Sequence, residues 1–192
     1  TPWAGISLLK NMVDRMGFDS FLNELDLPSQ GSNRGYSPSQ LIQQFMTSVW
    51  CGANRFEHTE ITRQDEVIRS FMGFDRMAGH KSFQRYFQKF NQATNQKVFT
   101  QWYQWFFSQL SFDNFTLDVD SSVHTKYGEQ QGAKRGYNTH KPGRVSHHPL
   151  MAFIPECRMV ANFWLRSGDA YTSNNIEGFL DDTFEKLQGK KV

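Results

Sequence analysis

The sequence predicts an α+β fold in which an all-helical N-terminal module precedes a strand-rich C-terminal one. Through residues 1–110, apolar side chains recur at three- and four-residue spacings, which is the period of amphipathic helices. From Ser111 onward, apolar residues alternate with polar ones in short runs, which is the period of strands with one buried face. This change predicts a boundary between a helical module of residues 1–112 and a second domain of residues 113–192.

The expected helices of the first module are bounded by turn residues. Gly17, Pro28 and Gly52 each end an apolar helical pattern, because glycine and proline favour a break in a helix. Ser37 and Pro38 begin the third helix as its N-cap and its first-turn proline. The helices are expected over residues 6–16, 18–27, 37–51, 57–72, 81–91 and 93–110.

The second domain begins with a strand pattern at 115–124, followed by strands at 150–156 and 159–166 and a helix at 174–188. A long basic loop rich in glycine joins the first two strands. The chain ends directly after the helix, so three strands precede it and none follows to pair with them. We therefore expect this domain to be the incomplete start of a larger core.

Two carboxylates lie two residues apart in the first of these strands. Asp118 and Asp120 project to the same side of such a strand, because side chains alternate between its faces. Like charges held that close repel each other unless a cation or a basic group lies between them. Mg²⁺ is commonly held by one or two carboxylates together with phosphate oxygens, so the pair is a candidate metal site. The alternative is structural, with one acid solvated at the strand end and the other capping the turn.

A basic surface is expected on the loop of residues 134–148. Lys134, Arg135, Lys141 and Arg144 lie in this loop without an intervening acid. Such a loop can follow a phosphate backbone, where binding is electrostatic and carries little sequence information. A solvated surface hairpin explains the same residues equally well.

A second basic stripe lies on the helix expected at 81–91. Lys81 and Arg85 are four residues apart, opposite a stripe of aromatic side chains. This pattern suits a helix that lies on DNA. It also suits an ordinary amphipathic surface helix, so both interpretations stay open.

Composition excludes several classes of protein. The chain of 192 residues carries 21 basic and 19 acidic side chains, so any surface for nucleic acid has to be local. Its two cysteines form neither a disulfide framework nor a zinc motif, which suits a reducing compartment. No apolar run approaches the roughly 18 residues of a membrane span, and the N-terminus has no signal-peptide pattern. We therefore expect a soluble, cytoplasmic protein.

Two blocks of the sequence are similar to a known family. The first comprises Cys51-Gly-Ala-Asn-Arg-Phe-Glu-His-Thr-Glu60, Met77-Ala-Gly-His80 and Phe83-Gln-Arg-Tyr-Phe87. The second comprises Leu117-Asp-Val-Asp-Ser-Ser122, Tyr127-Gly-Glu-Gln-Gln-Gly132, Arg135-Gly-Tyr137, His148-Pro-Leu150 and Leu165-Arg-Ser-Gly168. In this order the chain resembles the N-terminal part of DDE transposases of the IS1380/IS4 insertion-sequence group.

The resemblance implies a helical module that helps to bind transposon ends, followed by the first strands and first helix of an RNase H-like core. In such enzymes three carboxylates hold two divalent metals, Mg²⁺ or Mn²⁺, during DNA strand cleavage and strand transfer. By this match Asp120 is the first catalytic Asp and a metal ligand, and Asp118 is a supporting metal ligand. The candidate nucleic-acid contacts are Lys134, Arg135, Lys141, Arg144, Lys81 and Arg85.

The same resemblance implies a homodimer that binds the terminal inverted repeats of a transposon, in the cytoplasm and associated with the nucleoid. The family's second Asp and its Glu are expected on later strands, beyond the last residue of this chain. We therefore expect the chain to be a fragment that is inactive alone. The alternative function is that of a truncated transposase, acting as a DNA-binding or dimerising inhibitor without catalysis.

Overall fold

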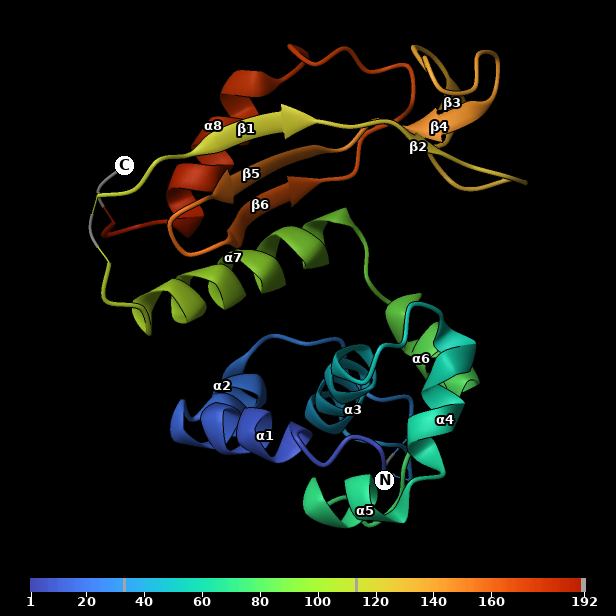
Figure 1. The fold of residues 1–192 in the computed structure, drawn as a ribbon, viewed down its shortest axis with the longest axis vertical. Helices are drawn as coiled ribbons and strands as arrows, with labels where there is room; N and C mark the ends of the chain where they lie inside the picture. The colour runs from blue at the N-terminus through green and yellow to red at the C-terminus, as the bar shows by residue number, and fades with distance from the viewer. Residues whose placement is uncertain (33, 113, 191–192) are drawn as a thin grey trace. The chain divides into compact units, whose positions relative to one another are not determined.

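The computed structural model describes residues 1–32, 34–112 and 114–190 and shows an α+β fold (Figure 1). The chain forms two compact units, Thr1–Phe99 and Thr100–Val192. Within the described ranges, every helix is too short or too polar to cross a lipid bilayer.

The first unit is helical. Ser37 caps its third helix as predicted, because the Ser37 side chain accepts the backbone N–H of Gln40 at 3.2 Å. The elements of this unit are α1 (Ile6–Arg15), α2 (Phe18–Glu24), α3 (Pro38–Trp50), the 3₁₀ helix η1 (Phe56–His58), α4 (Thr59–Arg63), α5 (Glu66–Phe71), α6 (His80–Phe87) and the first turns of α7 (Gln92–Ser108).

The single helix expected over 57–72 is divided into η1, α4 and α5. The break between α4 and α5 lies at Asp65, whose backbone is extended. Its carboxylate accepts the backbone N–H groups of Val67 and Ile68 at 2.9 and 3.1 Å, and this cap begins a new helix. The sequence prediction was wrong here because apolar residues recur at helical spacing on both sides of the cap.

Aromatic rings and one buried amide hold α3 in the first unit. The ring centroid of Phe45 lies 5.7 Å from that of Phe56 and 5.0 Å from that of Phe87. The buried side chain of Gln44 accepts the N–H of Ala78 and donates to the carbonyl of the same residue, both at 2.7 Å. These contacts tie α3 to the segment that leads into α6.

The second unit contains two antiparallel sheets. The larger has the order β1-β5-β6, formed by β1 (Asp118–Ser121), β5 (Leu150–Ile154) and β6 (Met159–Trp164). The smaller has the order β2-β4-β3, formed by β2 (His124–Thr125), β3 (Lys134–Arg135) and β4 (Val145–His147). The strand expected over 115–124 is thus divided between the two sheets, and the expected basic loop contains β3 and β4.

Helix α8 (Ile176–Lys186) lies along one face of the larger sheet (Figure 1). Val119 and Ala152 contribute to the core beneath this helix, together with Phe179 from the helix itself. Because side chains alternate along a strand, Asp118 and Asp120 lie on the face of β1 opposite to Val119. The packed face and the acidic face of β1 are therefore separate.

A buried polar network fastens α8 to β6. Asp182 is 6% exposed and accepts hydrogen bonds from Asn162 Nδ2 and Trp164 Nε1, both at 2.7 Å. Lys186 is 4% exposed and pairs with the same carboxylate oxygen. Removing a charged pair from water is costly, and the additional hydrogen bonds to Asp182 offset part of that cost.

The two units divide inside α7, whereas the sequence predicted a boundary at 112/113. Tyr103 and Phe107, from the last turns of α7, pack into the core of the second unit. Gln104 donates a hydrogen bond to the backbone carbonyl of Glu185 in α8 at 3.0 Å. The change from helical to strand periodicity therefore marks the end of a helix, not the end of a compact unit. Residue 113 itself lies outside the described residues.

Candidate active site

The carboxylates of Asp118 and Asp120 are exposed on one face of β1. In the antiparallel register, Asp118 lies opposite Phe153 and Asp120 lies opposite Met151 of β5. Met151 is 38% exposed, so solvent reaches the sheet beside Asp120. The strand thus presents both acids to solvent on the face that α8 does not cover.

The end of β1 orients the Asp120 carboxylate. Its Oδ1 atom accepts the backbone N–H of Ser121 at 2.7 Å. An ionised carboxylate has about four acceptor positions on its two oxygens, so this bond leaves capacity for further ligands. Asp120 is therefore held in place and remains able to bind a cation or a hydrogen-bond donor.

Ser121 takes part in a hydrogen-bonded network with residues distant in sequence. Its hydroxyl oxygen lies 3.2 Å from Nε2 of His148 and 2.9 Å from the hydroxyl oxygen of Thr172. Nδ1 of His148 lies 2.7 Å from the carbonyl oxygen of Ala170, which can only accept. In neutral His148 the proton is therefore assigned to Nδ1, and Nε2 accepts the hydroxyl proton of Ser121. The Ser121 oxygen is then free to accept from Thr172.

Arg166 holds the segment that carries these partners. Its guanidinium donates to the backbone carbonyls of His148, Tyr171, Thr172 and Asn174 at 3.1, 3.1, 3.3 and 3.0 Å. Burial lowers the pKa of Arg166, although an arginine remains charged in proteins. One cation therefore fixes both the backbone at His148 and the turn that follows β6.

Two glycines allow the backbone after β3 to pass against the backbone after β6. A Cβ on Gly136 would lie 1.8 Å from the carbonyl oxygen of Gly168. A Cβ on Gly168 would lie 2.3 Å from the carbonyl oxygens of both Lys134 and Ser146. Only glycine permits so close an approach, because it has no Cβ. The contact fixes the smaller sheet against residues 166–172.

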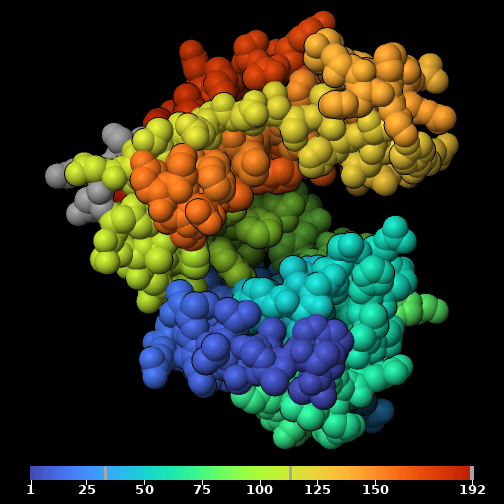
Figure 2. Space-filling model, in the orientation of Figure 1, coloured from blue at the N-terminus to red at the C-terminus, as the bar shows by residue number. Residues whose placement is uncertain are grey.

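Residues 126–146, here named the basic hairpin, carry four of the predicted nucleic-acid contacts. Lys141 and Arg144 lie over the ring of Tyr127, at 5.0 and 5.7 Å from its centroid. A hydrogen bond from Lys141, and then the charges of Lys141 and Arg144, lower the pKa of the Tyr127 phenol. The basic hairpin is exposed on the surface shown in Figure 2, where it is coloured yellow to orange.

The other two predicted residues of the hairpin, Lys134 and Arg135, form β3, and both are exposed. Lys134 Nζ lies 3.2 Å from the carboxylate of Asp169. A hydrogen bond from Ser167, and then one from Lys134, lower the pKa of Asp169. Asp169 is therefore paired with a cation of β3.

Lys81 and Arg85 lie on α6 in the first unit, and both are exposed. Nε of Arg85 donates to the backbone carbonyl of Lys81 at 3.2 Å. Phe83 and Tyr86 of the same helix are buried. The helix thus has the basic and aromatic faces that the spacing predicts, and a role in nucleic-acid binding stays a prediction.

The oxygen ligands at the end of β1 suit a hard divalent cation. Asp118 and Asp120 offer carboxylates, the ligands that Mg²⁺ prefers, and Ser121 orients one of them. Among the residues that the structure describes, no group of three or more His, Cys, Asp or Glu side chains converges on one point. The pair therefore offers carboxylate oxygens that suit part of a metal site.

Sequence reasoning missed the neighbours of Ser121. His148 is 27 residues away along the chain, and that separation matches no local motif. Arg166 donates a hydrogen bond to the backbone carbonyl of His148, and a backbone acceptor of this kind is not visible as a sequence motif. The only available signal was indirect, since both residues lie in the short blocks that carry the family resemblance.

The model of one protein family, described as transposase DDE domain group 1, matches residues 1–191. Comparison with curated proteins and with solved structures finds no match. The family model covers almost the whole chain, including both units and the carboxylates of β1.

Proposed function

This chain belongs to the DDE transposase family, and from that premise we propose that it supplies the first catalytic carboxylate, Asp120, of an insertion-sequence transposase of the IS1380/IS4 group. Asp118 acts beside it as a supporting metal ligand. One observation carries the proposal: two exposed carboxylates share a face of β1, and the N–H of Ser121 orients one of them.

The topology of the second unit supports its assignment as the first part of an RNase H-like core. Strands β1, β5 and β6 form an antiparallel sheet in that order, and α8 follows β6 and packs on one face. This is the arrangement expected of the opening strands and first helix of such a core. The carboxylates then lie on the strand that opens it.

Asp118 and Asp120 are the residues that would hold Mg²⁺ or Mn²⁺. A bound divalent cation neutralises the charge that develops on a phosphate during strand cleavage. The chain itself fixes both acids on one strand and orients Asp120 through Ser121. His148 in turn contacts the Ser121 side chain, with its Nε2 atom 3.2 Å from the Ser121 hydroxyl oxygen.

The DNA partner of the proposed enzyme is the terminal inverted repeat of a transposon. The basic hairpin supports this assignment, since its exposed cations can contact phosphates without reading base sequence. Binding is then expected to weaken steeply as salt increases, because counterions are released from the phosphates.

Titration with Mn²⁺, followed by electron paramagnetic resonance, tests the metal site. Asp120→Asn is expected to weaken Mn²⁺ binding by about tenfold or more, because one of two anionic ligands is lost. Asp181→Asn is the matched control, since Asp181 is an exposed acid on α8. Equal effects of the two substitutions would contradict the assignment of Asp120.

We further propose that the 192-residue chain does not transfer DNA strands alone, because its described residues bring no third acid to the pair. The alternative function is a non-catalytic inhibitor that binds DNA or dimerises. In the described sheet β1 pairs only with β5, and the other edge of β1 supports pairing with a second copy.

A nicking assay and sedimentation separate these two functions. Metal-dependent nicking that Asp120→Ala abolishes would show that the chain is catalytic as it stands. Salt-dependent DNA binding by a sedimenting dimer, without nicking, is the result expected for the inhibitor.

A further inference from the structure

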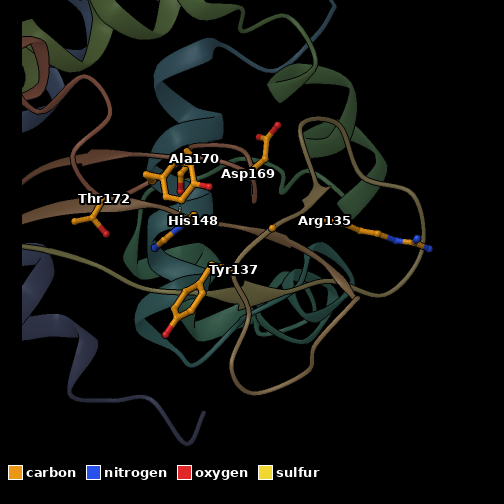
Figure 3. A pocket seen from close by; sticks show the side chains of 8 residues that line it. Arg135, Tyr137, His148, Asp169, Ala170 and Thr172 are labelled. Atoms are coloured by element: carbon orange, nitrogen blue, oxygen red, sulfur yellow. Dashed lines mark hydrogen bonds between the residues drawn. The ribbon is translucent and has the colours of Figure 1, made fainter.

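A cavity of about 570 Å³ lies between the basic hairpin and the segment that follows β6 (Figure 3). Tyr137, Tyr171, His148 and Thr172 are among the residues that line it. Sites for small organic groups commonly have volumes of roughly 300–1,000 Å³. The cavity is therefore large enough to accept a nucleobase with its sugar.

This cavity adjoins the end of β1. Thr172 and His148 line it, and both contact the hydroxyl of Ser121, at 2.9 and 3.2 Å. Ser121 follows Asp120 in the chain and donates its backbone N–H to the Asp120 carboxylate. The Ser121 side chain lies on the same face of the sheet as its β5 partner Leu150, whereas the Asp120 carboxylate lies on the other face, so the cavity adjoins the end of β1 on the side away from that carboxylate.

Two tyrosines at the cavity are largely uncovered. Tyr137 is 68% exposed and Tyr171 is 72% exposed, whereas Tyr86 in the first unit is 3% exposed. Aromatic side chains in this state act as platforms on which successive bases of a single strand stack. Stacking of this kind tolerates every base, because each base has a π face.

The walls of the cavity are held by contacts already formed in the protein. Gly136 and Gly168 bring the two backbones together, and Arg166 binds the carbonyls of Tyr171 and Thr172. A preformed wall loses little conformational freedom when a ligand binds. The site is thus organised before its ligand arrives.

The charges around the cavity favour a nucleic-acid strand. Arg135 lines the cavity, and in Figure 3 its side chain extends away from the other labelled side chains. Lys141 and Arg144 are cations of the same hairpin. Asp169, the acid at the cavity, is already paired with a cation of β3. Phosphates of a strand can therefore lie on the hairpin while a base enters the cavity.

We propose that this cavity binds one unpaired nucleobase of a DNA strand, stacked on Tyr137 and Tyr171, with the neighbouring phosphates on the basic hairpin. The inference rests on the proposed function, because it takes a DNA strand as the ligand. A base inside a duplex is paired and stacked on both sides, so it reaches the cavity only after leaving the stack. The site therefore selects frayed or single-stranded DNA over intact duplex.

Oligonucleotides that carry 2-aminopurine test this site with the full chain. One probe is single-stranded and the other is the same strand in a duplex. Binding is expected to quench the fluorescence of the single-stranded probe. The double variant Tyr137→Ala with Tyr171→Ala is expected to weaken that binding about tenfold or more. Duplex affinity is expected to remain unchanged. Tyr→Phe at both positions retains quenching, because phenylalanine also stacks, and this variant shows that the loss does not come from misfolding.

Phe99→Ala is the control, since Phe99 is an aromatic residue of α7 that is 47% exposed and lies outside the cavity lining. An equal loss of affinity for both probes, or no loss of affinity in the double variant, would overturn the stacking site. Neither result would contradict DNA binding by the chain. A free 2-aminopurine nucleotide that binds as tightly as the strand overturns the assignment to a DNA strand. Failure of both probes to bind at low salt overturns the inference and also contradicts the proposed function.

Discussion

Two acids of the second unit, Asp182 and Asp120, lie on opposite sides of one sheet in very different surroundings. Asp182 is 6% exposed, accepts hydrogen bonds from Asn162 and Trp164, and pairs with Lys186. Asp120 is exposed and keeps acceptor capacity for a ligand. A buried carboxylate is stable only when hydrogen-bond donors or a cation of the protein pair with it. An exposed carboxylate is solvated by water and can exchange that water for a bound cation. The surroundings, not the residue type, separate a structural acid from a candidate catalytic one.

The largest effect is expected from breaking the buried pair. Asp182→Ala leaves the ammonium of Lys186 buried and unpaired, which is expected to lower the free energy of unfolding by about 3–5 kcal/mol. Urea unfolding, monitored by tryptophan fluorescence, measures the change. Replacing both residues by apolar ones, Asp182→Leu with Lys186→Met, is expected to recover most of the loss.

Asp120→Asn is the matched control on the other side of the sheet. Because Asp120 is exposed, this change is expected to alter the free energy of unfolding by less than about 0.5 kcal/mol. A loss as large as that of Asp182→Ala would mean that Asp120 is structural, and the contrast between the two acids would fail.

A smaller effect is expected from the close approach of Gly168 to the backbones of Lys134 and Ser146 in the smaller sheet. Gly168→Ala places a Cβ 2.3 Å from two carbonyl oxygens, so the backbones must separate. The expected loss is about 1–3 kcal/mol, with faster hydrogen exchange in the basic hairpin. Gly178→Ala is the control, because its Cβ would meet Trp164 at an ordinary 3.7 Å. Similar losses in both variants would show that the close approach is not the cause.

The first unit contains an acid between these extremes. Glu60 is 29% exposed, and its carboxylate accepts from the backbone and ring nitrogens of His80 at 2.7 and 2.8 Å and from Arg63 at 2.5 Å. Partial burial favours a higher pKa for Glu60, but the hydrogen bonds from His80 and Arg63 outweigh it and lower that pKa to about 2. The carboxylate thus holds the start of α6 against α4.

Among the destabilising substitutions, the smallest loss is expected from Glu60→Gln, at about 1–2 kcal/mol near neutral pH. The folded-state pKa of about 2 lies below the ordinary value of 4.5, so the ionised form is stabilising above pH 4.5. That stabilisation is lost as the pH falls towards about 2, and the variant and unsubstituted chains should then converge. Urea unfolding across this pH range measures the difference in the free energy of unfolding. Glu66→Gln is the control, because Glu66 is an exposed acid that pairs with Arg69. A difference independent of pH would contradict the role of the ionised carboxylate.

Local signals predicted α3 and the acidic strand well. The cap at Ser37 and the alternation around Val119 each depend on neighbours within a few residues, so their patterns are visible in the chain itself. The division of α4 from α5 at Asp65 was missed, although it is also local, because a helical apolar spacing continues across the cap. The strands of the basic hairpin were missed because they are short and almost wholly polar.

The sequence by itself determined the α+β class and the resemblance to DDE transposases, because periodicity and short motifs are properties of neighbouring residues. It also placed Asp118 and Asp120 on one side of a strand, since alternation follows from strand geometry. Only the tertiary structure decided which acids are buried, where α7 divides between units, and that His148 reaches Ser121. Burial and hydrogen bonding of this kind depend on contacts between segments far apart in the chain, and those contacts exist only once the chain has folded.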